Sequence, residues 1–131
     1  MNKPELRFYS LWNTIGVALI LLVIYLSVTP IPPRLEEFHF NDKIGHFIAY
    51  FVLMFWYGQI HYQFKIRLGF LIFFITLGYG LEGVQSLTAY RSFEYFDAWA
   101  NASGASVAWL LTLGKLSGLL QRIEAYFIRR N

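Results

Sequence analysis

Long apolar stretches separated by short polar segments dominate the chain. The stretches cover residues 11–28, 44–60, 68–87 and 96–113. Each is about 17 to 20 residues long, the length that an α-helix needs to cross roughly 30 Å of hydrocarbon. The pattern predicts an all-α integral membrane protein, a single domain over residues 1–131 with four transmembrane helices in an antiparallel bundle. We expect these helices at about residues 11–29, 42–61, 67–87 and 96–115.

Local signals support the ends of these elements. The sequence TPIPP at residues 29–33 ends the first helix, because proline cannot continue a helix and biases its predecessor towards extended structure. No small-x-small cleavage site follows the first stretch, which favours a retained anchor over a cleaved signal peptide. In the tail over residues 121–131, Ile123, Tyr126 and Phe127 share one face, as expected of an amphipathic helix on the cytoplasmic surface.

Composition and charge agree with a membrane protein. Of the 131 residues, 56% are hydrophobic and 15% are charged, against about 25% charged in typical soluble domains. The pI of 9.3 raises nucleic-acid binding as an alternative, but the basic residues follow the predicted topology rather than one face, so no nucleic-acid partner is expected. The termini and second loop carry Lys3, Arg7, Lys65, Arg67, Arg122, Arg129 and Arg130. The other two loops carry Arg34, Lys43 and Arg91. The positive-inside rule therefore places both termini in the cytoplasm.

The fourth helix carries a row of small residues. Ala100, Gly104 and Ala108 are spaced four apart and let another helix approach closely in lipid. Packing within the monomer is the main interpretation, and a seam between two copies in a homo-oligomer is the alternative.

Polar residues in the last three helices are predicted to meet near the outer face. Because those helices alternate in direction, the start of the second, the end of the third and the start of the fourth lie at one depth. His46, Glu82 and Asp97 are the candidate catalytic acid–base residues. The candidate ligand-binding residues are Asp42, Lys43, Gln85, Arg91 and Asn101. Intramembrane ionisable residues usually face the bundle interior, pair with one another and mark function.

Other interpretations of this cluster stay open. It can be a structural network that fixes the register of the helices, since removing one partner of a buried network is costly. A metal site is weighed, but the spacing lacks the close repeat of known metal motifs, so we predict neither a metal nor a cofactor. A transporter or proton path is the weakest alternative, because the inner halves of the helices are almost free of polar residues. Whether the chain is an enzyme is left open.

Three short motifs resemble the VanZ-like family of small bacterial membrane proteins. These are DKIGHFIAY, EGVQSLTAYR and DAWANASGASVA, which carry the polar positions above in order, although Ala108 stands where the family often has glycine. The resemblance implies a multi-pass protein of the bacterial cytoplasmic membrane, linked to resistance to teicoplanin-type glycopeptides. It implies a pocket that binds or modifies a lipid-linked, anionic envelope component at the outer face of the lipid bilayer. The alternative is a non-enzymatic assembly or accessory protein whose polar cluster is structural.

Overall fold

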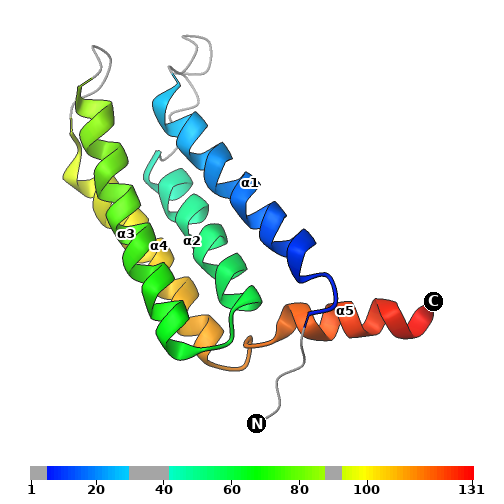
Figure 1. Cartoon of the computed structure of the whole chain (residues 1–131). Helices are drawn as coiled ribbons and strands as arrows, with labels where there is room; N and C mark the ends of the chain where they lie inside the picture. The colour runs from blue at the N-terminus through cyan, green and yellow to red at the C-terminus, as the bar shows by residue number, and fades with distance from the viewer. Residues whose placement is uncertain (1–5, 30–41, 88–92) are drawn as a thin grey trace.

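The structure, a computed structural model, describes residues 6–29, 42–87 and 93–131 and is helical, with no strand in those residues (Figure 1). The helices are α1 (Tyr9–Val28), α2 (Asp42–Ile60), α3 (Phe64–Ser86), α4 (Tyr95–Leu113) and α5 (Leu119–Arg130). The predicted all-α class is confirmed. The helices begin and end within three residues of the ranges expected from the sequence. Asp42 begins α2, but its side chain lies outside the described part of the chain, as does Arg91.

Helices α1 to α4 lie alongside one another and alternate in direction, and α5 lies across one end of them (Figure 1). The start of α2, the end of α3 and the start of α4 are at the opposite end from α5. We call these the polar end and the α5 end of the bundle. This arrangement separates the predicted polar cluster from the amphipathic tail by the length of the helices.

Helix α2 is the central element, because it contributes more residues to the apolar core than any other helix. Tyr50, Leu53, Met54 and Tyr57 recur at helical spacing and are almost completely buried. Phe74 of α3 packs into the same cluster, and the small residues of α4 complete it. The core therefore consists of large side chains on α2 and α3 that pack against small side chains on α4.

Helices α2 and α4 approach closely at two glycines. A Cβ atom on Gly104 would lie 2.2 Å from the backbone oxygen of Phe47, and one on Gly58 would lie 2.6 Å from Cγ2 of Thr112. Small residues allow such backbone contact, which makes van der Waals packing and tight register available to the two helices. Of the predicted packing row, Gly104 and Ala108 are buried against the core and Ala100 is partly buried.

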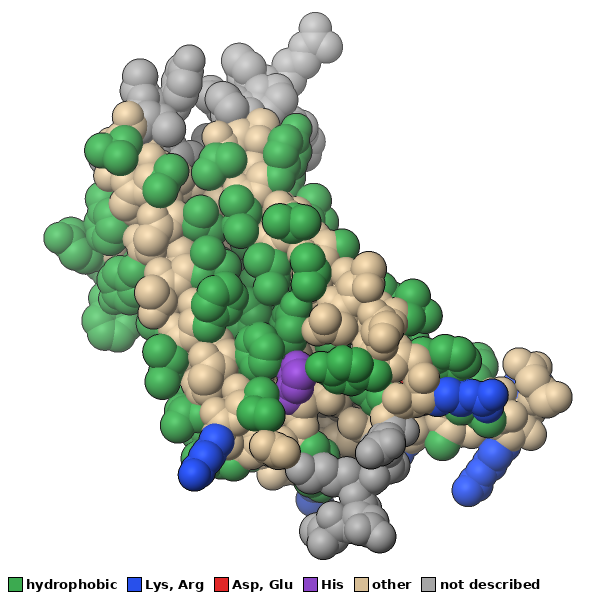
Figure 2. Space-filling model, in the orientation of Figure 1, with side chains coloured by type: hydrophobic (Ala, Val, Ile, Leu, Met, Phe, Trp, Pro, Cys, Tyr) green, Lys and Arg blue, Asp and Glu red, His purple; other side chains and the backbone are tan. Residues whose placement is uncertain are grey.

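The bundle exposes large apolar side chains along its flank. Helices α1 and α3 are long and apolar enough to cross a membrane. Exposed side chains include Leu21, Leu22, Tyr25, Leu26, Ile44, Ile48, Val52, Ile72, Phe73, Trp99, Val107 and Leu110. Figure 2 shows this apolar flank, with the Lys and Arg side chains that are visible on this face lying towards the α5 end. Continuous apolar surface of this kind marks contact with a membrane or with another protein.

Candidate metal centre

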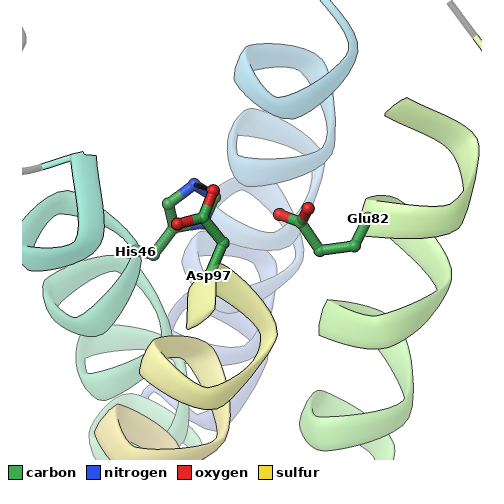
Figure 3. A group of neighbouring side chains, drawn as sticks. All are labelled: His46, Glu82 and Asp97. Atoms are coloured by element: carbon green, nitrogen blue, oxygen red, sulfur yellow. Dashed lines mark ion pairs between the residues drawn. The ribbon is translucent and has the colours of Figure 1, made fainter. Parts of the chain in front are cut away.

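His46, Glu82 and Asp97 meet at the polar end of the bundle. They come from the first turns of α2, the last turns of α3 and the first turn of α4, so the antiparallel arrangement brings them to one level. One potential ligand atom from each residue lies within 4.8 Å of the other two. Figure 3 shows the Glu82 carboxylate pointing from α3 towards the Asp97 carboxylate and the His46 ring. This convergence of a nitrogen and two carboxylate oxygens is a set of donors that divalent metals bind.

The His46 ring is oriented by contacts on both nitrogens. Its Nδ1 is 3.0 Å from Oδ1 of Asn101, and its Nε2 is 3.5 Å from Oδ2 of Asp97. The Asn101 oxygen can only accept, so Nδ1 carries the proton that it donates there. In the neutral ring, Nε2 then presents its lone pair towards Asp97. Histidines that bind metals commonly donate from the other ring nitrogen in this way, which fixes the tautomer and the ring orientation.

Both carboxylates are held inside the protein. The exposed fractions of Glu82 and Asp97 are 2% and 3%, and the His46 side chain is mostly covered. Asn101 is buried beside them, and Gly78 of α3 makes room for it, since a Cβ at Gly78 would lie 3.0 Å from the Cβ of Asn101. Buried carboxylates need a compensating cation, proton or hydrogen-bond donor, because removal from water disfavours their charge.

The rim of the centre carries charge that is open to solvent. Lys43 Nζ lies 3.8 Å from Oδ1 of Asp97 and 3.9 Å from Oε2 of Glu94. The side chains of Lys43 and Glu94 are each 54% exposed, so their pairing is screened and contributes little to stability. Lys43 is therefore placed at the mouth of the centre rather than among its buried groups.

The structure brings some of the predicted site residues together and separates others. His46, Glu82, Asp97 and Asn101 form the buried centre, with Lys43 at its rim. The remaining described residue, Gln85, turns towards α1. Its Nε2 donates to the backbone oxygen of Ser27 at 2.5 Å, which joins the ends of α1 and α3. This bond of Gln85 connects α1 to α3.

Sequence reasoning missed two buried ionic residues at the α5 end. Arg67 is 3% exposed and donates to backbone oxygens at the ends of α2 and α4, including Gly58 and Thr112. Glu124 of α5 accepts from the backbone N–H of Phe8 and from Nε1 of Trp12. The sequence offered one indication, which is that Arg67 and Glu124 are charged residues next to apolar stretches. The count of basic residues for the positive-inside rule treated Arg67 as a solvated loop residue.

The chain is similar to an uncharacterized protein of the fission yeast Schizosaccharomyces pombe. The two are 33% identical over 118 residues, which cover 86% of this chain and 70% of the relative. No protein-family model and no solved structure matches the chain.

These comparisons correct three expectations. The relative is a eukaryotic protein and no VanZ-like model matches, so the assignment to that bacterial family is wrong. The envelope function and the link to teicoplanin-type resistance depended on that family and are withdrawn with it. The bacterial cytoplasmic membrane is likewise unsupported as the location. The physical reason is that Asp, His, Glu and Asn at three- and four-residue spacing arise wherever helices line a buried polar centre, so the motifs are not specific to one family.

Proposed function

We propose that this chain, which belongs to the same family as the uncharacterized fission-yeast protein, is a multi-pass membrane protein that binds one divalent metal ion through His46, Glu82 and Asp97. The observation that carries the proposal is the convergence of three ligand atoms within 4.8 Å from three different helices. Two of the three side chains are buried carboxylates, which solvated surface clusters do not have.

Electrostatics favours a cation at this position. Two buried carboxylates and the His46 ring face one another, and two carboxylates at this distance repel each other when both are ionised. A divalent cation offsets that repulsion and uses each group as a ligand. The bond from His46 Nδ1 to Asn101 then serves as the supporting contact that orients the ligating nitrogen.

The donor set points to the zinc class of metals. Imidazole suits zinc and its neighbours in the transition series, whereas calcium and magnesium prefer ligands that are all oxygen. Three protein ligands also match catalytic zinc sites, in which water occupies the fourth position. A zinc ion held by His46, Glu82 and Asp97 would lower the pKa of a bound water towards neutrality and so supply a nucleophile. The reaction class that fits is therefore metal-assisted hydrolysis, with Lys43 at the rim placed to attract a negative group.

Four membrane crossings are the second part of the proposal. Helices α2 and α4 each have 19 residues and so span about 28 Å, close to the thickness of the hydrocarbon core. They are less apolar than α1 because α4 uses small residues for packing and both carry residues of the polar centre. Their outward faces expose large apolar side chains as α1 and α3 do, including Ile48 and Leu110. A bundle with this flank is stable in lipid and prone to aggregate in water.

Metal content of the purified protein tests the proposal. The full chain in detergent is stripped with a chelator, incubated with Zn²⁺ or Co²⁺, desalted and analysed for metal by mass spectrometry. Wild type is expected to retain a single ion per chain, and Glu82→Gln or Asp97→Asn is expected to lose it. Glu94→Gln, which removes an exposed carboxylate at the same end, is the matched control and should retain the ion.

Two results would overturn the metal proposal. One is a folded wild-type protein that retains no ion. The other is retention that is equal in wild type and Asp97→Asn, because the ion would then lie elsewhere. In either case the cluster is an acid–base pair or a structural network, and the melting temperature of Glu82→Gln separates these. A large fall indicates a structural network, whereas an unchanged or higher value indicates a carboxylate kept for function at a cost in stability.

A further inference from the structure

Helix α5 is fixed to the bundle by buried polar contacts on one face. Gln59, at the end of α2, accepts from the backbone N–H of Leu120 at 3.3 Å and, through its own backbone oxygen, from Nε2 of Gln121 at 3.0 Å. One turn further along α5, Glu124 holds Trp12 and the backbone at the start of α1. These contacts leave α5 lying across the end of the other helices, as Figure 1 shows.

The other face of α5 is exposed and is both apolar and basic. Ile123, Tyr126 and Phe127 are 42%, 59% and 60% exposed, and nothing in the described part of the protein covers them. The exposed basic residues of this helix are Arg122, Arg129 and Arg130. The acidic residue of the helix, Glu124, is buried on the docked face, so the free surface carries only positive charge.

Position and charge favour one occupant for this surface. Helix α5 begins just after α4 ends, so in a membrane-inserted bundle it lies at the level of the lipid headgroups. Phe8 and Tyr9 at the start of α1 are also exposed at this end of the bundle. Aromatic side chains with basic residues beside them are the composition that partitions into a membrane interface, where anionic lipids attract arginine.

We infer that the exposed face of α5 is a binding surface for anionic lipid headgroups, with Ile123, Tyr126 and Phe127 inserted below the headgroups and Arg129 and Arg130 paired with their charge. Arg130 is already placed next to this face, since its Nη1 donates to the hydroxyl of Tyr126 at 3.1 Å. The inference rests on the proposed membrane insertion and is independent of the metal centre.

Site-directed spin labels on the full chain test this inference. The chain has no cysteine, so single cysteines can be introduced at Ile123 on the exposed apolar face, at Ala125 on the other side of α5, and at Leu21 in the exposed middle of α1. Each labelled variant is reconstituted in vesicles of phosphatidylcholine alone or with phosphatidylserine. Collision with lipid-soluble oxygen and with a water-soluble nickel complex then reports the surroundings of each label.

We expect the Ile123 label to collide mainly with oxygen and the Ala125 label to collide mainly with the nickel complex. The Ile123 label should lie deeper in the membrane in vesicles that contain phosphatidylserine than in vesicles of phosphatidylcholine alone. The substitutions R129Q and R130Q together should abolish that dependence on phosphatidylserine. Equal nickel collision at Ile123 and Ala125 in both vesicles would overturn the inference, as would spin–spin broadening at Ile123, which would show a second copy on the surface. The Leu21 label reports insertion separately, so failure of the membrane proposal is distinguishable from failure at α5.

Discussion

Arg67 shows how one charge is accommodated at the α5 end. Its guanidinium donates to the backbone oxygens of Gly58, His61 and Thr112 at 2.7 Å and to the hydroxyl of Ser117 at 3.1 Å. These oxygens belong to the last turns of α2 and α4 and to the segments that follow them, where the negative ends of the helix dipoles lie. A single side chain thus satisfies carbonyl groups that the helices leave unbonded. Its charge and the burial of His61 lower the pKa of the His61 ring, with burial the larger cause.

Arg67→Lys is predicted to destabilise the protein although it keeps the charge. A lysine has three donors on one atom and cannot reach carbonyl groups on two helices, so at least one charged hydrogen bond is lost. We expect the free energy of unfolding to fall by about 3 kcal/mol, from the usual worth of such bonds. Thermal unfolding in detergent measures the change. Lys65→Arg, at an exposed position two residues before Arg67, is the control and should melt as wild type does. Equal melting of both variants would contradict the role assigned to Arg67.

At the scale of the elements, the lengths of the apolar stretches and the spacing of the polar residues were sufficient to predict the helices and the meeting of three polar residues. Stretches of 17 or more apolar residues predict helices, and alternating direction predicts that His46, Glu82 and Asp97 meet. Contacts that depend on the exact start and tilt of a helix could not be predicted. Helix α3 begins at Phe64, three residues before the expected start at residue 67, so Arg67 lies further inside the helix and its side chain is buried rather than solvated. The three proposed metal ligands come from three different helices, so no single local motif contains them.

The contact between α2 and α4 gives the second prediction. Gly104→Ala places a methyl group 2.2 Å from the backbone oxygen of Phe47, and backbone cannot move aside as a side chain can. The helices must separate, which costs about 2 to 4 kcal/mol of stability by the usual effect of overpacking. Because His46 precedes Phe47, its ring moves away from Asn101, and Co²⁺ binding should weaken as well. Gly45→Ala, where no atom lies within 4 Å, is the control and should be neutral or slightly stabilising. Wild-type stability in Gly104→Ala would show that the helices are not in contact there.

At the scale of the whole molecule, the chain has two chemically different ends. The polar end holds the buried Glu82 and Asp97, and the α5 end holds the exposed arginines together with the buried Arg67 and Glu124. Positive charge at one end is what orients a bundle in a membrane, so the α5 end is predicted to face the cytoplasm. The proposed metal centre would then lie near the opposite surface of the membrane.

Single-cysteine labelling distinguishes four crossings from two. Cysteines are introduced into the cysteine-free chain at or just after the ends of α1, α2, α3 and α4, at Thr29, Gln63, Ser86 and Lys115. With four crossings, an impermeant maleimide applied to the non-cytoplasmic side should label Thr29→Cys and Ser86→Cys, and the other two only after permeabilisation. If only α1 and α3 cross, Thr29→Cys and Gln63→Cys react from one side and Ser86→Cys and Lys115→Cys from the other. A labelling side that alternates along the four positions therefore requires α2 and α4 to span the membrane. Glu82 and Asp97 then lie inside the membrane, where the need of buried carboxylates for a bound cation is greatest.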